Sequence, residues 1–270
     1  MNISVIVSTY NSEAWLEKVL QGYAVQTYRD FEVIIADDGS RPTTQALVER
    51  YARDYPVPLR HIWHEDQGYR RQEILNQAIP IAAHEYILFT DGDCIPRNDF
   101  VAMHALFAEK GRFLSGGYCK LGMDLSEKIS ADDISSGRCF DLAWLKQQEP
   151  MNLSNRLKLG AGPTRGKLLD AITTAKPTFN NCNSSAWKDD LLAINGYDER
   201  MKYGGPDREL GERLENYGVM GKQIRHRAIC VHLDHSRGYK TKESVQNNLA
   251  IRAQTVGEKI VWTPHGIVKP

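Results

Sequence analysis

Long apolar runs and an excess of charge of either sign are both absent from this sequence of 270 residues. No apolar stretch approaches the roughly 18 residues that a membrane-spanning helix needs. The 34 Lys and Arg residues balance 34 Asp and Glu residues, so no overall positive field favours nucleic acid as a partner. The opening segment has no basic region, and its apolar stretch is too short for a signal peptide. These absences favour a soluble, cytoplasmic globular protein.

Paired cysteines and a glycine-rich first loop are also missing. The five cysteines are odd in number and widely spaced, with no C-x-x-C pair, which disfavours a disulfide framework or a zinc site and favours buried thiols. The polar turn at 8–11, after the first apolar run, contains no glycine. The G-x-G-x-x-G fingerprint is therefore absent, which disfavours a nicotinamide or flavin dinucleotide as cofactor.

Apolar runs alternate with amphipathic segments through the first third of the chain. The runs predict buried strands, and the segments between them have apolar residues at helical spacing. Strands are expected at 3–7, 31–36, 59–63 and 86–90, and helices after Ser12, through 46–51 and at 71–82. Because strand–helix–strand crossovers build parallel sheets, we predict a doubly wound α/β layer with its ligand site at the carboxyl ends of the strands.

The second half of the chain is less regular. The segment 121–177 is polar, with weak periodicity, and we expect it to be an insertion over the sheet with some helix near 140–146. After it, a compact unit, a strand and a helix-prone tail from about 236 are expected. The compact unit comprises 181–188, a turn at 195–198 and a helix at 207–217, and the strand is at 228–232.

Two acidic turns follow predicted strands. The turn 91–93, D-G-D, places two carboxylates one residue apart, and its glycine lets the backbone bend. Such oxygen ligands suit Mg²⁺ or Mn²⁺, which usually share their shell with substrate phosphates, although a lone D-x-D can also be a solvated turn. The turn 37–40, D-D-G-S, is either a plain turn or a place where a carboxylate accepts hydrogen bonds from a nucleobase or ribose.

Several motifs in a fixed order carry a family resemblance. They read V-I-V-S-T-Y-N, A-D-D-G-S, F-T-D-G-D-C, N-C-N-S-S-A-W-K, N-G-Y-D-E and Y-G-G-P-D-R-E-L-G-E-R-L. From residue 3 to about 235 the chain resembles the family 2 glycosyltransferases of the GT-A fold, in particular the branch with chondroitin-polymerase domains and β-1,4-galactosyltransferases. The resemblance implies a doubly wound, mostly parallel sheet with helices on both faces and a small C-terminal acceptor-binding part. That branch carries G-G-E-D, and Pro206 here replaces its glutamate, so the donor preference stays open.

The resemblance also implies roles for individual residues. The nucleotide pocket would be formed by Thr9, Tyr10, Asp38, Tyr69, Arg71 and Asn76. Within it, Asp38 would hold the uracil or ribose, and Tyr69 and Arg71 would contact the uracil. Asp91 would face the ribose and the metal.

The metal, Mn²⁺ or Mg²⁺, would be bound directly by Asp93. His232 matches a late histidine that closes the metal shell or touches the pyrophosphate. His235 is the other candidate for that role. The alternative for both histidines is an imidazole that bonds only to protein or solvent and binds no ligand.

Asp207 is the predicted catalytic base. An inverting transfer needs one base to deprotonate the acceptor hydroxyl, while the metal stabilises the departing phosphate. Asp207 follows two glycines and Pro206 at the start of a helix, where a carboxylate also has the simpler role of favouring the helix dipole. Glu209 is the fallback base.

The implied activity is an inverting, metal-dependent transfer from a UDP-sugar to a saccharide or lipid-linked saccharide, in surface polysaccharide or lipopolysaccharide synthesis. Residues 1–120 would bind the nucleotide-sugar and 121–270 the acceptor, within one continuous domain. A nucleotidyltransferase is disfavoured by the turn 8–11, which is neither glycine-rich nor basic. A non-catalytic carbohydrate- or nucleotide-binding module is favoured only by Pro206.

Basic residues cluster modestly at 225–227 and at Lys240 and Lys242. A solvated face is the simpler interpretation. Contact with anionic lipid, which would place the protein peripherally at the inner membrane, or with an acidic acceptor is the alternative.

Overall fold

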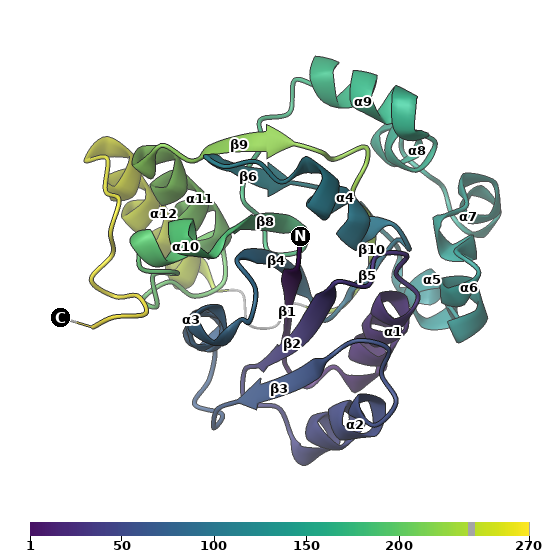
Figure 1. The fold of residues 1–270 in the computed structure, drawn as a ribbon, viewed down its shortest axis with the longest axis horizontal. Helices are drawn as coiled ribbons and strands as arrows, with labels where there is room; N and C mark the ends of the chain where they lie inside the picture. The colour runs from purple at the N-terminus through teal and green to yellow at the C-terminus, as the bar shows by residue number, and fades with distance from the viewer. Residues whose placement is uncertain (237–240, 270) are drawn as a thin grey trace.

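Two sheets of unequal size organise the computed structural model, which describes residues 1–236 and 241–269 (Figure 1). The strands are β1 (Ile3–Thr9), β2 (Phe31–Asp37), β3 (Leu59–Trp63), β4 (Tyr86–Asp91), β5 (Cys94–Pro96), β6 (Arg112–Ser115), β7 (Gly117–Lys120), β8 (Ser184–Trp187), β9 (Met220–Gln223) and β10 (Ile229–His232). Within the described residues, the large sheet has the order β3-β2-β1-β4-β8-β6-β9 and the small sheet the order β5-β10-β7.

The ends of three predicted strands meet at one edge of the large sheet. Strands β1, β2 and β4 run parallel, and their residues are almost all buried because helices cover both faces. In register, Thr9 lies opposite Asp37 and Ser8 lies opposite Asp91. The expected strands and their common polar edge are therefore confirmed.

The rest of the large sheet is mixed. Strand β8 runs antiparallel to both β4 and β6, whereas β9 pairs in parallel with β6. Parallel pairs still predominate, as expected for a doubly wound fold. The second half of the chain thus completes the sheet begun by the first half, since β8 and β9 both lie beyond residue 121.

Helices pack on both faces of the large sheet and bury two apolar clusters. On one face lie α1 (Glu13–Ala24), α2 (Pro42–Ala52) and α4 (Phe100–Phe107). On the other lie α3 (Arg71–Ile81), α10 (Lys188–Ala193) and α11 (Pro206–Tyr217). Apolar residues at helical spacing form each contact, for example Leu16 and Leu20 of α1 and Ile74 and Leu75 of α3, all at most 1% exposed.

The small sheet joins two distant parts of the chain. Strand β5 begins directly after Asp93 and pairs antiparallel with β10, so that Cys94 lies opposite His232. Strand β7 pairs in parallel with the other side of β10. The last acidic residue of the D-G-D turn is thereby brought next to the late histidines.

The segment 121–177 is more helical than expected. Its helices are α5 (Met123–Lys128), α6 (Ala131–Ser135), the 3₁₀ helix η1 (Arg138–Phe140), α7 (Leu142–Gln148), α8 (Leu153–Leu159) and α9 (Pro163–Ile172). Each is too short to show periodicity, and side-chain caps from Ser130, Asp141 and Asn152 begin three of them. The segment also lies along one side of the molecule, against α1 and β7, instead of over the large sheet (Figure 1).

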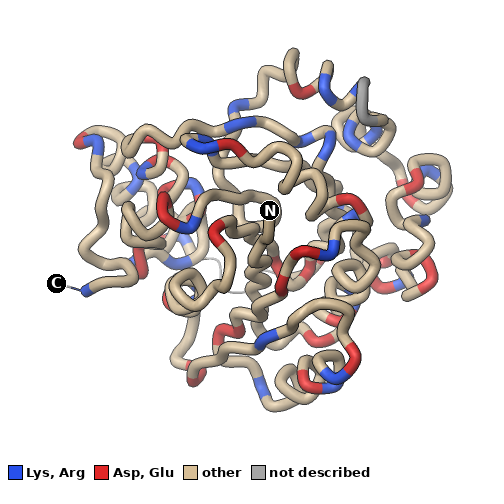
Figure 2. Tube along the Cα trace, in the orientation of Figure 1, with Lys and Arg blue, Asp and Glu red and all other residues tan. Residues whose placement is uncertain are grey.

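The predicted helix-prone tail contains α12 (Lys242–Gly257), which packs against α11. Among the described residues no helix combines the length and apolar character needed to cross a bilayer. Acidic and basic residues are mixed over the fold (Figure 2). Of the basic residues suggested for lipid contact, Lys240 lies outside the described residues.

Candidate active site

The carboxyl edge of the large sheet holds a network centred on Arg71, the first residue of α3. Arg71 Nε donates to Ser8 Oγ over 2.9 Å, and the guanidinium forms an ion pair with Asp91. Ser8 Oγ donates to Asp91 Oδ1 over 3.0 Å. Burial opposes the charged form of Arg71, but Asp91, together with Tyr69, Tyr197 and Asp207, outweighs burial, and the pKa of Arg71 is raised. The edge therefore holds a permanent cation in a fixed position.

Asp207 approaches the same cation from the start of α11. Its carboxylate accepts the Asn181 N–H over 3.3 Å and the Arg208 N–H over 3.0 Å. Burial raises the pKa of Asp207, and the nearby Asp91 raises it further. Arg71 and the two N–H groups act in the opposite direction and lower it. A carboxylate with a raised pKa is a stronger base, which suits proton abstraction.

The backbone before Asp207 needs glycine. Gly204 and Gly205 have φ values of 115° and 100°, in the left-handed region that side chains strain. Pro206 then begins the helix, where its missing N–H leaves no hydrogen bond unmade. Replacement of the family glutamate by Pro206 therefore leaves Asp207 in the first turn of α11.

A second cluster lies beside the small sheet and brings Asp93 together with both candidate histidines. His235 Nε2 is 3.0 Å from Asp93 Oδ2, and His232 Nε2 is 4.0 Å from Asp93 Oδ1. The imidazole rings stack with centroids 5.8 Å apart. Burial alone would raise the pKa of Asp93, but the two imidazoles lower it.

The second nitrogen of each ring indicates what the cluster can bind. Nδ1 of His232 lies 2.8 Å from the Leu233 carbonyl oxygen, and Nδ1 of His235 lies 2.8 Å from the Ser236 carbonyl oxygen. A carbonyl can only accept, so each Nδ1 carries hydrogen, and a neutral ring then has a lone pair on Nε2. Two lone pairs that face the carboxylate of Asp93 need a proton or a cation between them.

The ligand types fit a first-row divalent ion. One carboxylate and two imidazoles suit Mn²⁺, which accepts both oxygen and nitrogen, better than Mg²⁺, which prefers oxygen. Cys94 Sγ also lies in this cluster, where ligand atoms of Asp93, Cys94 and His232 are within 4.8 Å of one another. Burial raises the pKa of the Cys94 thiol, which donates to Asp93 Oδ1 over 3.3 Å. As a protonated thiol it is a poor ligand for a hard ion.

Asp38, expected to hold the uracil or ribose, lies at the end of β2 with protein donors on both oxygens. His64 Nε2 is 2.8 Å from Asp38 Oδ1, and the Arg70 N–H donates to Oδ2 over 3.1 Å. Burial raises the pKa of Asp38, and these partners oppose the rise. The carboxylate is thus held rigidly, with 7% of its side chain exposed.

Three further residues assigned to the nucleotide pocket lie near this edge. The Thr9 hydroxyl is buried and has no hydrogen-bond partner within residues 1–236 and 241–269. The Tyr10 ring is exposed, and its hydroxyl donates to Asp66 Oδ2 over 3.0 Å. Tyr69 is half-buried, and burial raises the pKa of its phenol. A ligand at the end of β1 would therefore meet an unsatisfied hydroxyl and two aromatic rings.

Two residues predicted from the sequence to belong to the site are bonded to protein groups instead. The Asn76 amide is buried and bonds to the Tyr197 backbone, to its carbonyl over 2.9 Å and its N–H over 2.7 Å, so it fixes the turn at 195–198 to α3. Glu209 is 1% exposed and forms an ion pair with Arg213 at 2.7 Å. Both groups are enclosed by protein partners, so we expect a structural role for each in place of the predicted contact with substrate.

Sequence reasoning missed Ser8, Asn181 and Tyr197. Ser8 is the polar residue just before a strand end, a signal that could have identified it. Tyr197 is fully buried, and its hydroxyl donates to Asn181 Oδ1, while the Asn181 N–H holds Asp207. Both residues lie in motifs that carry the family resemblance, but only the fold brings the two segments together and shows their contact with the site.

Known proteins resemble the chain over most of its length. It is 26% identical to the uncharacterized glycosyltransferase YfnE of Bacillus subtilis, an alignment that covers 93% of this chain and 69% of the relative. It is 24% identical to the chondroitin synthase of Pasteurella multocida, covering 83% of this chain and 24% of the relative. The chain thus spans about two thirds of one relative and a quarter of the other.

Solved structures share the fold. S. aureus TarS 1–349 in complex with UDP-GlcNAc has a TM-score of 0.65 and 17% identity, covering 97% of this chain and 70% of that one. The mannosyltransferase PcManGT of Pyrobaculum calidifontis, in complex with GDP-Man and Mn²⁺, has a TM-score of 0.60 and 20% identity. The alignment covers 96% of this chain and 62% of that one. The architecture is therefore the GT-A fold, as expected.

The sequence match establishes the family. The acidic turns and the polar edge of the sheet are consistent with it. Residues 4–140, half of the chain, match the family model described as glycosyl transferase family 2. Those residues contain both acidic turns and Arg71, which build one side of the site. The chain is a glycosyltransferase and belongs to glycosyl transferase family 2.

Proposed function

We propose that the protein transfers a sugar from a UDP-sugar to a saccharide acceptor with inversion, in a reaction that depends on Mn²⁺ or Mg²⁺. The observation that carries this proposal is the convergence of Asp93, His232 and His235 beside the edge where Asp91 and Asp207 flank Arg71. Such an arrangement would supply a metal shell, a fixed cation and a base to one reaction centre. Surface polysaccharide or lipopolysaccharide synthesis, at the cytoplasmic face of the membrane, is the proposed setting.

The donor nucleotide would lie along the ends of β1, β2 and β4. Asp38, held by His64 and Arg70, is a rigid acceptor for the uracil or ribose donors. The unpartnered Thr9 hydroxyl and the Tyr10 ring would complete that end of the pocket. The complex of TarS with UDP-GlcNAc supports a uridine nucleotide in this fold.

Asp93, His232 and His235 would hold the divalent ion. When bound, the ion neutralises charge on the diphosphate leaving group. The Mn²⁺ in the PcManGT complex supports this choice, as do the imidazole ligands. Arg71 adds a second positive charge, fixed by Ser8 and Asp91, near the same leaving group.

Asp207 would act as the base. Its carboxylate takes the proton of the acceptor hydroxyl as the acceptor oxygen forms a bond to the anomeric carbon. The bond between that carbon and the UDP oxygen breaks, and UDP leaves with the electron pair. Burial supports this role because it raises the pKa of Asp207. The Asn181 and Arg208 N–H groups orient the carboxylate.

The test is release of UDP from a panel of UDP-sugars. Wild-type protein is incubated with each UDP-sugar in Mn²⁺, in Mg²⁺ or in EDTA, with and without saccharide acceptors, and thermal unfolding is followed in parallel. We expect one donor to raise the midpoint of unfolding and to release UDP only with metal, faster with acceptor. If every UDP-sugar leaves the midpoint unchanged and none releases UDP, a non-catalytic binding module becomes the better description.

A further inference from the structure

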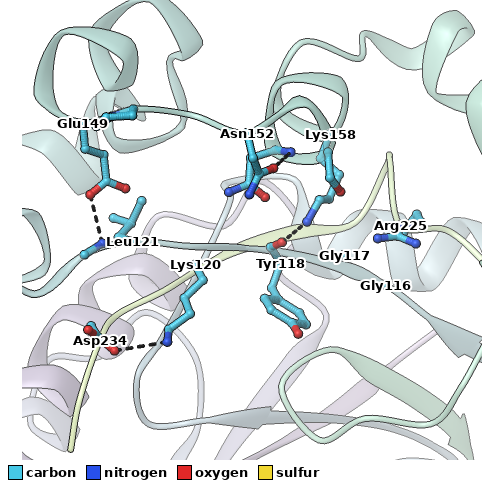
Figure 3. Close-up of a pocket in the computed structure, with 14 residues that line it drawn as sticks. Gly116, Gly117, Tyr118, Lys120, Leu121, Glu149, Asn152, Lys158, Arg225 and Asp234 are labelled. Carbon is cyan, nitrogen blue, oxygen red and sulfur yellow. Dashed lines mark hydrogen bonds and ion pairs between the residues drawn. The ribbon is translucent and has the colours of Figure 1, made fainter.

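A polar pocket with a volume of about 710 Å³ lies against the edge strand of the small sheet (Figure 3). It is lined by β7, by α8, by residues near Glu149 and by Arg225 in the loop before β10. A volume of this size falls in the range of small-molecule sites, about 300 to 1,000 Å³. The function proposed above gives this pocket no ligand.

The pocket is next to the metal cluster. Tyr118 of β7 lines it, and the Tyr118 ring centroid lies 5.9 Å from that of His232. Lys120, on the same strand, is the register partner of His232. A molecule that fills the pocket therefore ends beside the reaction centre, on the side of the small sheet.

Two cations in the lining lack an acidic partner. Lys158 of α8 is 6% exposed, and its Nζ donates to the Tyr118 carbonyl and forms no ion pair with any described residue. The Arg225 guanidinium has neither a hydrogen-bond nor an ion-pair partner in the described part of the chain. Burial, with a contribution from Arg225, lowers the pKa of Lys158. Figure 3 shows Lys158 reaching down to the Tyr118 carbonyl, with Arg225 beside Gly116 and Gly117.

The acidic residues of the lining already have partners. Asp234 forms an ion pair with Lys120 at 3.3 Å, and Glu149 Oε2 accepts the Gly122 N–H over 2.9 Å. Neither bond involves Lys158 or Arg225. A buried cation without a counter-charge is costly, and an anionic ligand would offset that cost.

We propose that this pocket binds an anionic group of the acceptor, a phosphate or a carboxylate, through Lys158 and Arg225. This assignment rests on the proposed function, because it treats the pocket as the acceptor side of a transferase site. Guanidinium and ammonium groups are the usual partners of both anions, and charged hydrogen bonds are the stronger ones. The acceptor would thus be an acidic or phosphate-bearing saccharide, held beside the metal cluster.

The experiment measures anion binding by calorimetry on the full chain. UDP and Mg²⁺ are present in excess to fill the donor site, and the probes are inorganic phosphate and methyl β-glucuronide. We expect saturable binding of at least one probe, weakened about tenfold or more in Arg225→Gln and in Lys158→Met. Arg53→Gln, which removes an exposed arginine at the end of α2, is the matched control and should bind as wild type does.

The two probes separate the possible sources of the anion. Binding of phosphate alone indicates a phosphorylated or lipid-diphosphate acceptor, and binding of the glucuronide indicates a uronic acid. The proposal is overturned if neither probe binds, or if Arg225→Gln binds both with wild-type affinity. Because Lys158 is buried and its variant can fail to fold, the half-buried Arg225 decides the outcome. Loss of UDP binding in the wild type would instead count against the proposed function.

Discussion

Two acidic turns of similar sequence, at the same edge of the same sheet, have opposite surroundings. In the turn after β2, Asp37 accepts the Ser40 N–H over 2.8 Å and lies 3.0 Å from His61, and Asp38 is likewise enclosed by protein donors. In the turn after β4, Asp93 faces the Nε2 atoms of His232 and His235, at 4.0 Å and 3.0 Å. The carboxylates of the first turn are held by protein donors, whereas Asp93 and the two imidazoles must share a proton or a cation.

From this difference we expect a carboxylate's neighbours to decide between a structural and a ligand-binding role. Asp207 and Glu209 repeat the contrast within one turn of α11. Glu209 is neutralised by the buried Arg213. Among the described residues, Asp207 accepts hydrogen bonds from two backbone N–H groups alone, and it shares the Arg71 cation with Asp91. The predictions below test whether the carboxylates divide in this way, beginning with the largest effect.

Replacement of Asp93 should abolish activity without unfolding the protein. In Asp93→Ala we expect the metal-dependent turnover to fall by about a thousandfold or more, because the only carboxylate of the cluster is lost. The measurement is the rate of UDP release with Mn²⁺, with circular dichroism as a check of folding. A variant that retains wild-type turnover would remove Asp93 from the metal shell.

Replacement of Asp207 should separate binding from transfer. Asp207→Asn keeps the shape of the side chain but cannot accept a proton, so kcat should fall by about a hundredfold to ten-thousandfold. Donor affinity, measured by calorimetry with UDP, should stay close to wild type. An unchanged kcat would place the base elsewhere.

Glu209→Gln is the matched control for Asp207→Asn. Gln cannot neutralise the fully buried Arg213, so we expect the free energy of unfolding to drop by about 3 to 5 kcal/mol. The folded fraction should keep its kcat. Urea unfolding measures the first quantity, and a kcat that falls as far as in Asp207→Asn would return Glu209 to the list of bases.

Asp37 should matter for stability alone. In Asp37→Ala the buried Ser40 N–H loses its acceptor, and we expect a loss of about 1 to 3 kcal/mol in the free energy of unfolding. Chemical denaturation measures it. A large loss of UDP affinity at unchanged stability would show that Asp37, and not Asp38 alone, contacts the ligand.

The pH profile should carry the smallest effect. The base must be ionised, and burial raises the pKa of Asp207 above its ordinary 3.8. As pH falls, kcat/KM should therefore begin to decrease at a higher pH than an unperturbed aspartate would give. Measurement of kcat/KM against pH under saturating metal checks this. An acid limb at the ordinary value would mean that Asp207 is not the base.

Local patterns predicted the first half of the fold well. The apolar runs at 3–7, 31–36 and 86–90 are long, bounded by polar turns and buried on both faces, so each signal was strong. The segment 121–177 was harder, because helices as short as α6, with five residues, show caps but no period. The edge strand β7 has only four residues, and its pairing depends on residues over a hundred positions away.

The site residues also fall into those that the sequence could predict and those that only the structure reveals. The D-G-D turn, the first turn of α11 and the late histidines were visible as residue types and spacings. That Glu209 is neutralised by Arg213, that Asn76 holds a turn, and that Tyr197 braces Asn181 were not visible. These roles depend on contacts between distant segments.

The sequence by itself determined which residues can carry charge, where strands end and hence which edge of the sheet is polar. Tertiary structure alone decided which of those charges are already paired, because pairing depends on neighbours that only packing supplies. For the same reason, Lys158 and Arg225, which have no acidic partner in the described part of the chain, stand out as a candidate site only because α8 lies beside β7.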